Sequence, residues 1–437
     1  MKLEYSNYRN HIGRLLKEVL EAADPYQLVS KALHYDQPQL TVHGRNIKFH
    51  SQAELVLLAV GKASTPMARA AAKTLRLDFK EIIVVRPEAD RAVLPAGWTV
   101  FQAGHPLPTD QSLAAGRAVR SVLGDLHAGD LIILLLSGGG SALLEVPKPD
   151  IELQDLRKVN EDLLRSGAPI DEINVVRKSM SLIKGGGLAR MSAPASVVSL
   201  ILSDVVGDDL GMVASGPTVI ERSDASRARE ILQSYGLWER YPERIQAGIM
   251  SEINAQDAAV PPVNILLANN QTVTNAAARK AAQLGFVVEV LSEPLSGEAR
   301  TAGDRFARRL RSLAAARPHD DLCLIQGGET TVTVRGAGLG GRNQEFAVAA
   351  AQALGNEGQN VILSFATDGV DGPTDAAGAI VDSQFAHRAK SLGLDPQSYL
   401  DANDVFTLLD RLGALIRTGP TQTNLNDIAL GFSYSSR

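Results

Sequence analysis

The sequence predicts an α/β protein of two domains, each built around a sheet of buried strands. The chain has 437 residues, more than one hydrophobic core usually serves. Short apolar runs alternate with amphipathic stretches along the chain, which is typical of strands and helices that alternate in a doubly wound parallel sheet. Most of the apolar runs end at glycine or at a polar loop, where open α/β sheets bind their ligands.

The first half of the chain contains helices followed by four predicted strands. Residues 9–34 have apolar positions at helical spacing, interrupted near Pro25, and predict a pair of helices. Buried strands are predicted at residues 54–61, 81–87, 131–140 and 195–209. The stretches "TPMARAAAKTLR" and "DQSLAAGRAVRSVLGDL" lie between them and predict amphipathic helices.

The second half repeats this alternation with different sequences. Its predicted strands are residues 263–269, 286–292, 322–329, 330–336 and 361–369. The polar, proline-containing stretch "EINAQDAAVPPV" (252–263) predicts a linker between the halves. The expected domains are therefore residues 1–255 and 256–424, and the tail of about residues 425–437 is a segment that could pack back on the first domain.

Composition narrows the functional class. Apolar residues make up 45% of the chain and charged residues 21%, as in an ordinary globular protein. The net charge of −5 argues against a dedicated nucleic-acid binder. The single cysteine, Cys323, excludes a disulfide framework and lies in the apolar run "LCLI", which predicts a buried, inert thiol.

No segment approaches 18 uninterrupted apolar residues, and the N-terminal stretch lacks the apolar region of a secretory signal. We therefore expect a soluble, cytoplasmic protein that neither spans a membrane nor binds nucleic acid.

Glycine-rich loops are the strongest functional signal. Glycine permits positive φ and lets a ligand approach backbone N–H groups, which is the basis of an anion-binding loop. One such loop is weak evidence, but six at predicted strand ends, several of which carry serine or threonine, predict a phosphorylated or highly charged ligand. The loops are "SGGGS" (137–141), "IKGGG" (183–187), "SDVVGDD" (203–209), "GGETT" (327–331), "GAGLGGRNQE" (336–345) and "TDGVDGPTD" (367–375), and a seventh, "RTGPTQTN" (417–424), lies near the C-terminus.

One of these loops matches a dinucleotide-binding fingerprint. Gly336, Gly338 and Gly341 have the spacing G-x-G-x-x-G and are followed by a predicted helix. Arg342 stands at the helix start, where close approach of a pyrophosphate favours a small residue. This match keeps a nicotinamide-dependent reductase as the alternative interpretation.

Phosphoryl transfer requires cations for the transferring group and carboxylates for a metal ion. Lys62 follows the predicted strand "LLAVG" and Arg342 begins a predicted helix, and both are preferred because solubility requires no positive charge at such positions. Lys184 and Arg177 come next. His105, in "AGHPLPTD", is a candidate general base and equally a turn residue. The carboxylates at predicted strand ends are Asp204, Asp208, Asp209, Glu329, Asp368 and Asp371.

Together these residues resemble one family, the class II glycerate kinases with a C-terminal MOFRL domain. The matching segments run in order from about residue 58 to 430: "AVGKAS", "GHPLPT", "LLSGGGSALL", "INVVRKSMSLIKGGGLA", "LSDVVGDDLGMVASGPT", "GGETTVTVRGAGLGGRNQE", "ATDGVDGPTDAAGA" and "TGPTQTNLNDI". Some members of this family have been labelled hydroxypyruvate reductases.

The resemblance implies transfer of the γ-phosphoryl group of ATP, with Mg²⁺, to the 2-hydroxyl of D-glycerate. It also implies a larger Rossmann-like N-terminal domain, a smaller C-terminal α/β domain and an active site in the cleft between them. Lys62, Arg342 and Asp204 are the expected catalytic residues, and Asp204 and Asp368 the expected metal ligands. Binding of substrate or phosphate is expected at Ser137, Gly138, Gly139, Gly140, Ser141, Lys184, Gly185, Asp208, Gly328, Glu329, Thr330, Gly340, Gly341 and Asn343.

Two alternatives remain at this stage. One is an NAD(P)H-dependent hydroxypyruvate or hydroxy-acid reductase, and the other is a binding module without chemistry. The sequence leaves open whether the protein is a monomer or a homodimer.

Overall fold

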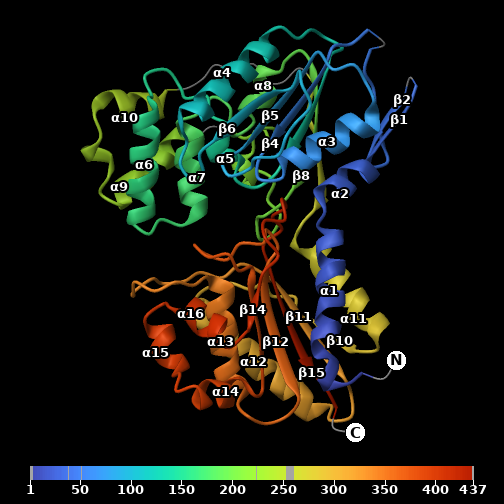
Figure 1. Cartoon of the computed structure of the whole chain (residues 1–437). Helices are drawn as coiled ribbons and strands as arrows, with labels where there is room; N and C mark the ends of the chain where they lie inside the picture. The colour runs from blue at the N-terminus through green and yellow to red at the C-terminus, as the bar shows by residue number, and fades with distance from the viewer. Residues whose placement is uncertain (1–2, 38, 51, 223, 252–259, 436–437) are drawn as a thin grey trace. The chain divides into compact units, whose positions relative to one another are not determined.

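The computed structural model describes residues 3–37, 39–50, 52–222, 224–251 and 260–435. They divide into two compact units (Figure 1). Unit 1 consists of Met1–Asp24 together with Ala268–Arg437, and unit 2 consists of Pro25–Leu267. The predicted linker falls largely on residues 252–259, which lie outside the described residues.

Unit 2 contains a six-stranded sheet with the strand order β6-β5-β4-β7-β8-β9. The pairs β4–β5, β4–β7, β5–β6 and β7–β8 are all parallel. Counted from β4, this is the 3-2-1-4-5-6 order of a Rossmann fold, so the predicted doubly wound sheet is confirmed. The strands are β4 (Leu55–Val60), β5 (Glu81–Pro87), β6 (Thr99–Ala103), β7 (Leu131–Leu136), β8 (Ser196–Leu202) and β9 (Val263–Ala268).

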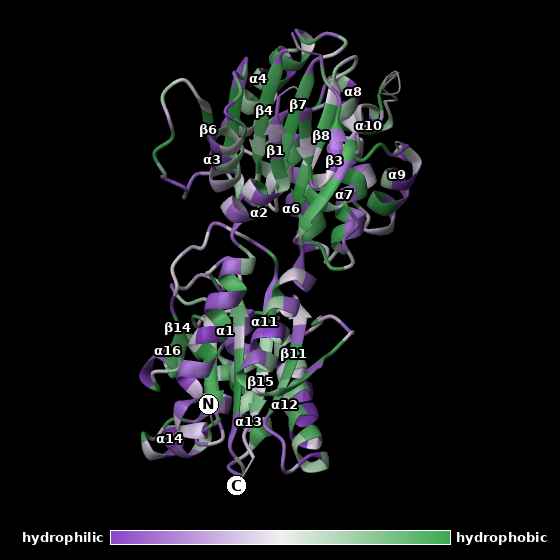
Figure 2. Cartoon of the chain, turned by 90° about the vertical axis from the view of Figure 1, so that its right-hand side faces the viewer, coloured by the Kyte–Doolittle hydropathy of each residue, from purple (hydrophilic) through white to green (hydrophobic). Residues whose placement is uncertain are grey.

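The central strands form because their residues are apolar on both faces. All six residues of β4, "LVLLAV", and all six of β7, "LIILLL", are buried. Figure 2 shows these strands in the hydrophobic colour. The helices around this sheet are α3 (Ser64–Leu75), α4 (Asp110–Gly124), α5 (Gly140–Leu143) and α8 (Gly187–Met191).

A second helical core and a small sheet complete unit 2. The helices α6 (Leu153–Arg165), α7 (Ile170–Ser179), α9 (Ala225–Ser234) and α10 (Glu243–Met250) share a hydrophobic cluster that includes Trp238 and Leu163. The small antiparallel sheet consists of β1 (Leu33–Asp36), β2 (Gln39–Val42) and β3 (Arg45–Ile47) and follows α2 (Pro25–Ala32). The sequence did not predict this small sheet.

Unit 1 contains a mixed six-stranded sheet with the order β10-β11-β15-β12-β13-β14. The pair β10–β11 is parallel, whereas β15 runs antiparallel to both β11 and β12. The strands are β10 (Val287–Val290), β11 (Leu322–Gly328), β12 (Asn360–Ala366), β13 (Gly378–Asp382), β14 (Leu415–Ile416) and β15 (Asp427–Ser433). The helices are α1 (Tyr8–Ala22), α11 (Asn270–Leu284), α12 (Ala299–Ala316), α13 (Arg342–Leu354), α14 (Phe385–Ser391), α15 (Pro396–Asp401) and α16 (Val405–Arg411).

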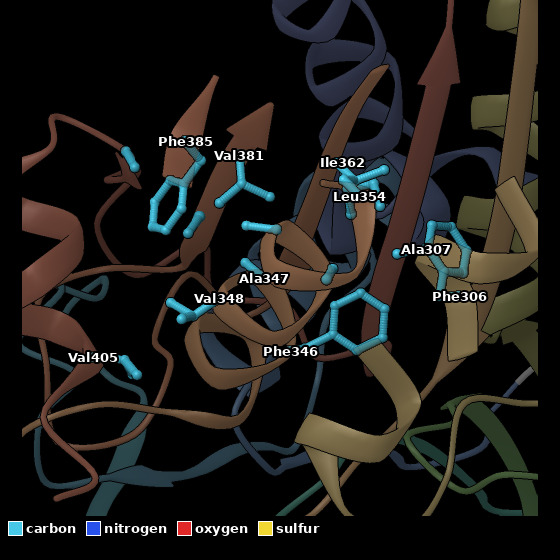
Figure 3. Packing of buried hydrophobic residues seen from close by; sticks show 14 of the residues in the cluster. Phe306, Ala307, Phe346, Ala347, Val348, Leu354, Ile362, Val381, Phe385 and Val405 are labelled. Atoms are coloured by element: carbon cyan, nitrogen blue, oxygen red, sulfur yellow. The ribbon is translucent and has the colours of Figure 1, made fainter. Parts of the chain in front are cut away.

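The core of unit 1 is centred on α13, of which nearly every residue is buried. Phe346 on α13 packs against Phe306 on α12 with ring centroids 5.6 Å apart, and Ile362 and Phe385 belong to the same cluster (Figure 3). Cys323 is fully buried in β11, as predicted.

The predicted domain boundaries differ from the structure at both ends. The N-terminal helix α1 belongs to unit 1, where Lys280 of α11 forms an ion pair with Glu18 at 3.0 Å. The tail forms β15 in the middle of the unit 1 sheet, so the idea that it packs on the first domain is wrong. The chain passes between the units at residues 24–25 and 267–268, whereas the predicted linker at 252–263 precedes β9 and so lies within unit 2.

Two predicted strands also differ. The strand expected at 263–269 in the second domain is β9, which lies beside β8 in the sheet of unit 2. Residues 330–336 form no strand beyond an isolated bridge at Thr331, although the alternation "TTVTV" favours one. This segment supplies no ladder to a neighbouring strand, and Val334 remains 74% exposed.

Candidate functional site

In unit 2 the candidate site lies where the strand order reverses. Val60, the last residue of β4, is in register with Leu136, the last residue of β7, so the loops after both strands begin at the same level. This is the topological switch point of the sheet, at which open α/β proteins bind their ligands. Lys62 follows β4 directly, and the SGGGS loop (residues 137–141) follows β7.

The two loops are tied together through Gly61 and Ser137. The N–H of Ala63 donates to Ser137 Oγ at 3.0 Å, and the N–H of Lys62 donates to the carbonyl of Gly138 at 2.9 Å. Gly61 has φ +123°, and a Cβ at this position would lie 2.5 Å from the carbonyl oxygen of Ser137. Only glycine permits this approach, which fixes the backbone of Lys62 against the SGGGS loop.

The SGGGS loop offers backbone donors. In the described part of the chain, the N–H groups of Gly138 and Gly139 make no hydrogen bond, and the short helix α5 begins at Gly140. Gly139 has φ +83°, the conformation that turns successive N–H groups toward one concavity. These donors are what an oxyanion requires.

Three polar side chains surround these glycines. A Cβ at Gly138 would lie 1.9 Å from Asp204 Oδ2, so the carboxylate of Asp204 occupies the space beside this glycine that a side chain would need. A Cβ at Gly139 would lie 3.1 Å from Cδ2 of His105 and 3.5 Å from Cγ of Lys62. The structure therefore brings Lys62, Asp204 and His105 to the same loop.

The electrostatics of His105 favour its neutral form. Partial burial, followed by the charges of Lys62 and Arg177, lowers its pKa to about 4. A neutral imidazole at physiological pH can accept a hydrogen bond from a substrate hydroxyl, but it is a weak base.

A group of buried hydrogen bonds and an ion pair lies next to Ser141, the last residue of the SGGGS loop. Ser141 Oγ lies 2.8 Å from Ser215 Oγ, which donates to Asn174 Oδ1 at 3.0 Å. Lys184 forms a buried ion pair with Glu145, and Arg177 Nε donates to Asn160 Oδ1 at 2.6 Å. Burial lowers the pKa of both Lys184 and Arg177, and the charge of Glu145 opposes this change.

The "IKGGG" loop does not follow a strand, contrary to prediction, because it connects α7 to α8. The N–H of Gly185 donates to the carbonyl of Ser215 at 2.9 Å, and that of Gly186 donates to the carbonyl of Gly216 at 2.7 Å. These amides support the fold and are not available to an anion. Asp208 has φ +56° in the loop after β8 and is partly exposed.

In unit 1 the candidate site is centred on Arg342, the first residue of α13. Its Nε donates to Asp427 Oδ2 at 2.5 Å and its NH2 to Asp427 Oδ1 at 2.9 Å. Glu329 Oε1 lies 3.1 Å from the NH1 group, and Asn426 Nδ2 donates to Glu329 Oε2 at 2.8 Å. Two carboxylates therefore hold the guanidinium in one orientation.

The strand register explains how Asp427 reaches Arg342. Asp427 is the first residue of β15 and pairs with Gly328 at the end of β11 and with Ala366 at the end of β12. Complete burial raises its pKa to about 7, although the charge of Arg342 opposes that rise. The contacts with Asp427 and Glu329 raise the pKa of Arg342 despite its own burial.

The glycines of the apparent dinucleotide fingerprint have a packing role. A Cβ at Gly336 would lie 2.1 Å from the carbonyl oxygen of Ala402, and one at Gly338 would lie 2.4 Å from Cβ of Asp404. A Cβ at Gly341 would lie 2.3 Å from Cγ of Asp371. The preceding residues form no strand, so the strand–loop–helix context of a nicotinamide site is missing here.

Asp371 and Asn343 stabilise the start of α13. Asp371 accepts from the N–H groups of Asn343 and Gln344 at 3.1 and 2.9 Å, and Asn343 Oδ1 accepts from Ser364 Oγ at 2.6 Å. Burial raises the pKa of Asp371, and these N–H groups oppose that rise. Because Asn343 is 1% exposed and satisfied inside the protein, the geometry does not offer it to a substrate.

The other predicted residues of unit 1 occupy the same loops. Gly328 has φ +142° against Leu295, Thr330 is buried, and Gly340 packs against Val405. Asp368 follows β12, and its Oδ1 accepts from the N–H of Val370 at 3.1 Å. Within the described ranges, no three or more His, Cys, Asp or Glu side chains are grouped so that they could hold a metal ion.

The sequence interpretation missed Asp427 and Glu145. Both are buried carboxylates paired with residues that were singled out, Arg342 and Lys184. A carboxylate at the edge of an apolar run, as in "NDIALGF" and "ALLEV", is the available signal, because such a charge is buried only with a partner.

Comparisons with known proteins show the family of the chain. Residues 11–250 match the family model described as "Domain of unknown function (DUF4147)", and residues 322–427 match the "MOFRL family". A relative named glycerate 2-kinase from Pyrococcus horikoshii is 38% identical over 97% of both chains. Another, named D-glycerate 2-kinase, from Thermotoga maritima, is 39% identical over 95% of this chain and 96% of its own.

A solved structure is also similar over nearly the whole chain. The crystal structure of a glycerate kinase from Thermotoga maritima has a TM-score of 0.86 and 36% sequence identity and covers 98% of this chain and 100% of its own. In the part of the chain described here, no helix has the length and apolar character needed to cross a membrane.

Proposed function

The chain belongs to the class II glycerate kinase family, and we propose that it uses Lys62 and Arg342 to transfer the γ-phosphoryl group of ATP to the 2-hydroxyl of D-glycerate. One observation carries the assignment of the site: the SGGGS loop, with its unused N–H groups, lies beside Lys62 and Asp204 at the switch point of a Rossmann sheet. Oxyanion donors, a cation and a carboxylate are the groups that phosphoryl transfer needs.

In unit 2, the N–H groups of Gly138 and Gly139 bind an oxyanion, either the glycerate carboxylate or a phosphate of ATP. Lys62 stabilises the charge on the transferring phosphoryl group. Asp204 is the candidate for a metal ligand or for the group that orients the attacking hydroxyl. His105 accepts a hydrogen bond from the substrate in its neutral form, consistent with its lowered pKa.

In unit 1, Arg342 is the second cation of the reaction. Its side chain is partly exposed, whereas Asp427 and Glu329 fix its orientation from one side. A guanidinium that is already oriented loses less conformational entropy when it binds a phosphate. Glu329, Gly340 and Gly341 act by shaping this surface.

Magnesium fits the residues when the nucleotide carries most of its ligands. Mg²⁺ in phosphoryl-transfer sites is held by one or two carboxylates together with phosphate oxygens and water. Asp204 in unit 2 and Asp368 in unit 1 are our candidates for those carboxylates. When bound, the ion neutralises charge on the phosphates.

The reductase alternative loses its main support. The three glycines that suggested it each fit against Ala402, Asp404 or Asp371 inside unit 1. The need for residues without a side chain at these positions is therefore accounted for without a pyrophosphate.

The purified protein should be incubated with ATP, Mg²⁺ and D-glycerate and coupled in parallel to enolase alone and to phosphoglycerate mutase plus enolase. Signal with enolase alone is expected, because it identifies 2-phosphoglycerate. Signal only with the mutase would contradict the assignment to the 2-hydroxyl. Absence of ATP consumption, with oxidation of NADH by hydroxypyruvate, would reverse the choice between kinase and reductase.

A further inference from the structure

Unit 2 contains a large cavity that the proposed phosphoryl transfer does not use. Its volume is about 750 Å³, within the range of small-molecule sites. Its described lining comes from α4, α7, α8 and the segments around them, and includes neither Lys62, Asp204 nor any residue of the SGGGS loop.

Cations outnumber carboxylates in the lining of the cavity. Six line it, Arg120, Lys148, Lys178, Lys184, Arg190 and Arg222, against the two carboxylates of Glu221 and Asp224. A concave surface with this imbalance attracts anions, since its low-dielectric walls focus the field.

The contacts that these cations make within the protein do not cancel the excess of positive charge in the cavity. Lys178 pairs with Glu221 at 2.7 Å and Lys184 pairs with Glu145, which lies outside the lining. Asp224 accepts from the N–H of Arg227 at 2.8 Å and so caps α9.

The remaining four cations have no carboxylate partner in the described structure. Arg190 donates to the carbonyls of Gly185 and Glu221 at 2.8 and 2.6 Å, and Lys148 donates to the carbonyl of Ser251 at 2.7 Å. Lys148 is only 3% exposed, and burial lowers its pKa to about 8. The side chains of Arg120 and Arg222 are exposed and make no hydrogen bond or ion pair with other described residues.

The uncharged part of the wall contains apolar side chains besides Ser179, Ser181 and two glycines. Val175, Leu182, Met191 and Ile220 contribute to it, and Ile220 is 38% exposed. An occupant must therefore combine a strongly anionic group with a less polar body.

We infer that this cavity binds a phosphorylated organic anion, with its phosphates on Arg120, Arg190 and Arg222 and its less polar part on Leu182, Met191 and Ile220. Arginine suits this task because its planar guanidinium forms paired hydrogen bonds with phosphate. Two sources share this chemistry, an adenine nucleotide and a phosphorylated three-carbon acid, and the proposal does not depend on the catalytic assignment above.

The test is direct binding to the full chain by calorimetry, without turnover. The probes are ADP, 2-phosphoglycerate and inorganic pyrophosphate, and the variant is Arg120→Ala/Arg222→Ala. The control is Arg91→Ala/Arg117→Ala, which removes the same charge from exposed arginines outside the cavity, one of them on α4. We expect the Kd of ADP or 2-phosphoglycerate to rise at least ~10-fold in the variant, and its salt dependence to decrease, with no change in the control.

ADP and 2-phosphoglycerate distinguish an adenine nucleotide from a phosphorylated three-carbon acid as the occupant. The occupant is the class whose probe loses affinity when Arg120 and Arg222 are replaced. A matching rise in the KM for ATP would identify the cavity as the binding site of the phosphoryl donor. A second variant, Ile220→Ser, should weaken the organic probe and leave pyrophosphate unaffected. Equal Kd values in variant and control, or a response of pyrophosphate alone, would overturn the inference.

Discussion

Arg342 and Asp427 form a bidentate pair in which the buried carboxylate of β15 accepts from both Nε and NH2 of the guanidinium, at 2.5 and 2.9 Å. Asp427 is fully enclosed, whereas Arg342 retains partial exposure. The pair therefore converts a flexible cation into a fixed donor at the start of α13. The charge of Arg342 is balanced within unit 1. Arg342 therefore contributes to phosphate binding through its fixed orientation as much as through its charge.

Removing the charge of Asp427 should impair catalysis more than folding. In Asp427→Asn, Arg342 loses one ionic partner, and we expect kcat to fall by about 10²-fold, whereas Asp427→Glu should recover part of that loss. Asp382→Asn is the matched control, because Asp382 pairs with Arg388 at 2.8 Å elsewhere in unit 1. Steady-state kinetics and thermal unfolding of all three variants would separate the two effects, and equal losses of kcat in the 427 and 382 variants would contradict a specific role.

The raised pKa of Asp427 predicts a pH dependence of stability. Its pKa is about 7 in the folded protein and 3.8 as an ordinary value, so between these values the folded state holds a proton that the unfolded state has released. The free energy of unfolding should therefore decrease as pH rises from about 4 to about 7. The charged groups facing Asp427 are Arg342, Glu329 and Asp371, and they will shape the curve.

Denaturant titrations of the wild type and of Asp427→Asn at several pH values would check this assignment. The variant should lack the decrease attributed to residue 427. A decrease of the same size in both proteins would assign it to another group.

Lys62 is expected to act on the transition state. Lys62→Ala should lower kcat by roughly 10²–10³-fold, because a charge aimed at the transferring group is lost in a partly desolvated site. Thermal stability should change little, since the backbone contacts of Lys62 with Gly138 remain. Lys73→Ala, an exposed lysine on α3, provides the control. A Lys62→Ala enzyme with unchanged kcat would exclude the role.

Gly139 should be required for binding rather than for folding. Gly139→Val places a Cβ 3.1 Å from the ring of His105 and strains a backbone at φ +83°, so we expect at least a ~10-fold rise in the KM for glycerate or ATP. Gly167→Val separates the two causes, because Gly167 has φ +72° with no atom within 4 Å of its Cβ position. The Gly167→Val enzyme should lose a similar amount of stability and keep the wild-type KM for glycerate and ATP. Unchanged kinetic constants in a folded Gly139→Val enzyme would show that the SGGGS loop binds no substrate.

Gly336 provides a test of the reductase alternative. Gly336→Ala would bring a methyl group to 2.1 Å from the carbonyl of Ala402, and we expect a loss of about 1–3 kcal/mol in the free energy of unfolding. Chemical denaturation would measure this loss. Fluorescence titration of the wild type with NADH should show no saturable binding, and saturable binding that Gly336→Ala weakens would restore the nicotinamide interpretation.

Much of unit 2 could be predicted from the sequence because its strands are continuous apolar runs. Residues 54–61 and 81–87 match β4 and β5 closely, and residues 131–140 contain β7, which ends at Leu136. Lys62 and the SGGGS loop were found for the same reason, since each follows such a run directly.

The sheet of unit 1 was harder to predict. The strand β15 contributes to the sheet through pairs with β11 and β12 that are distant in sequence, and no local pattern encodes such a partner. The role of Asp427 was missed because it depends on that pairing. The predicted strand at 330–336 failed because alternation alone does not provide a neighbouring strand with which to pair.

The position of β15 between β11 and β12 also sets the order in which the chain can become structured during its synthesis. The last strand of the unit 2 sheet ends at Ala268, so that unit can fold while the rest of unit 1 is still being made. Unit 1 must wait for residue 433, because until then β11 and β12 lack the strand that joins them. During this interval α1 has no completed core to join, and a nascent chain halted before residue 427 would contain Arg342 and Glu329 without the carboxylate of Asp427.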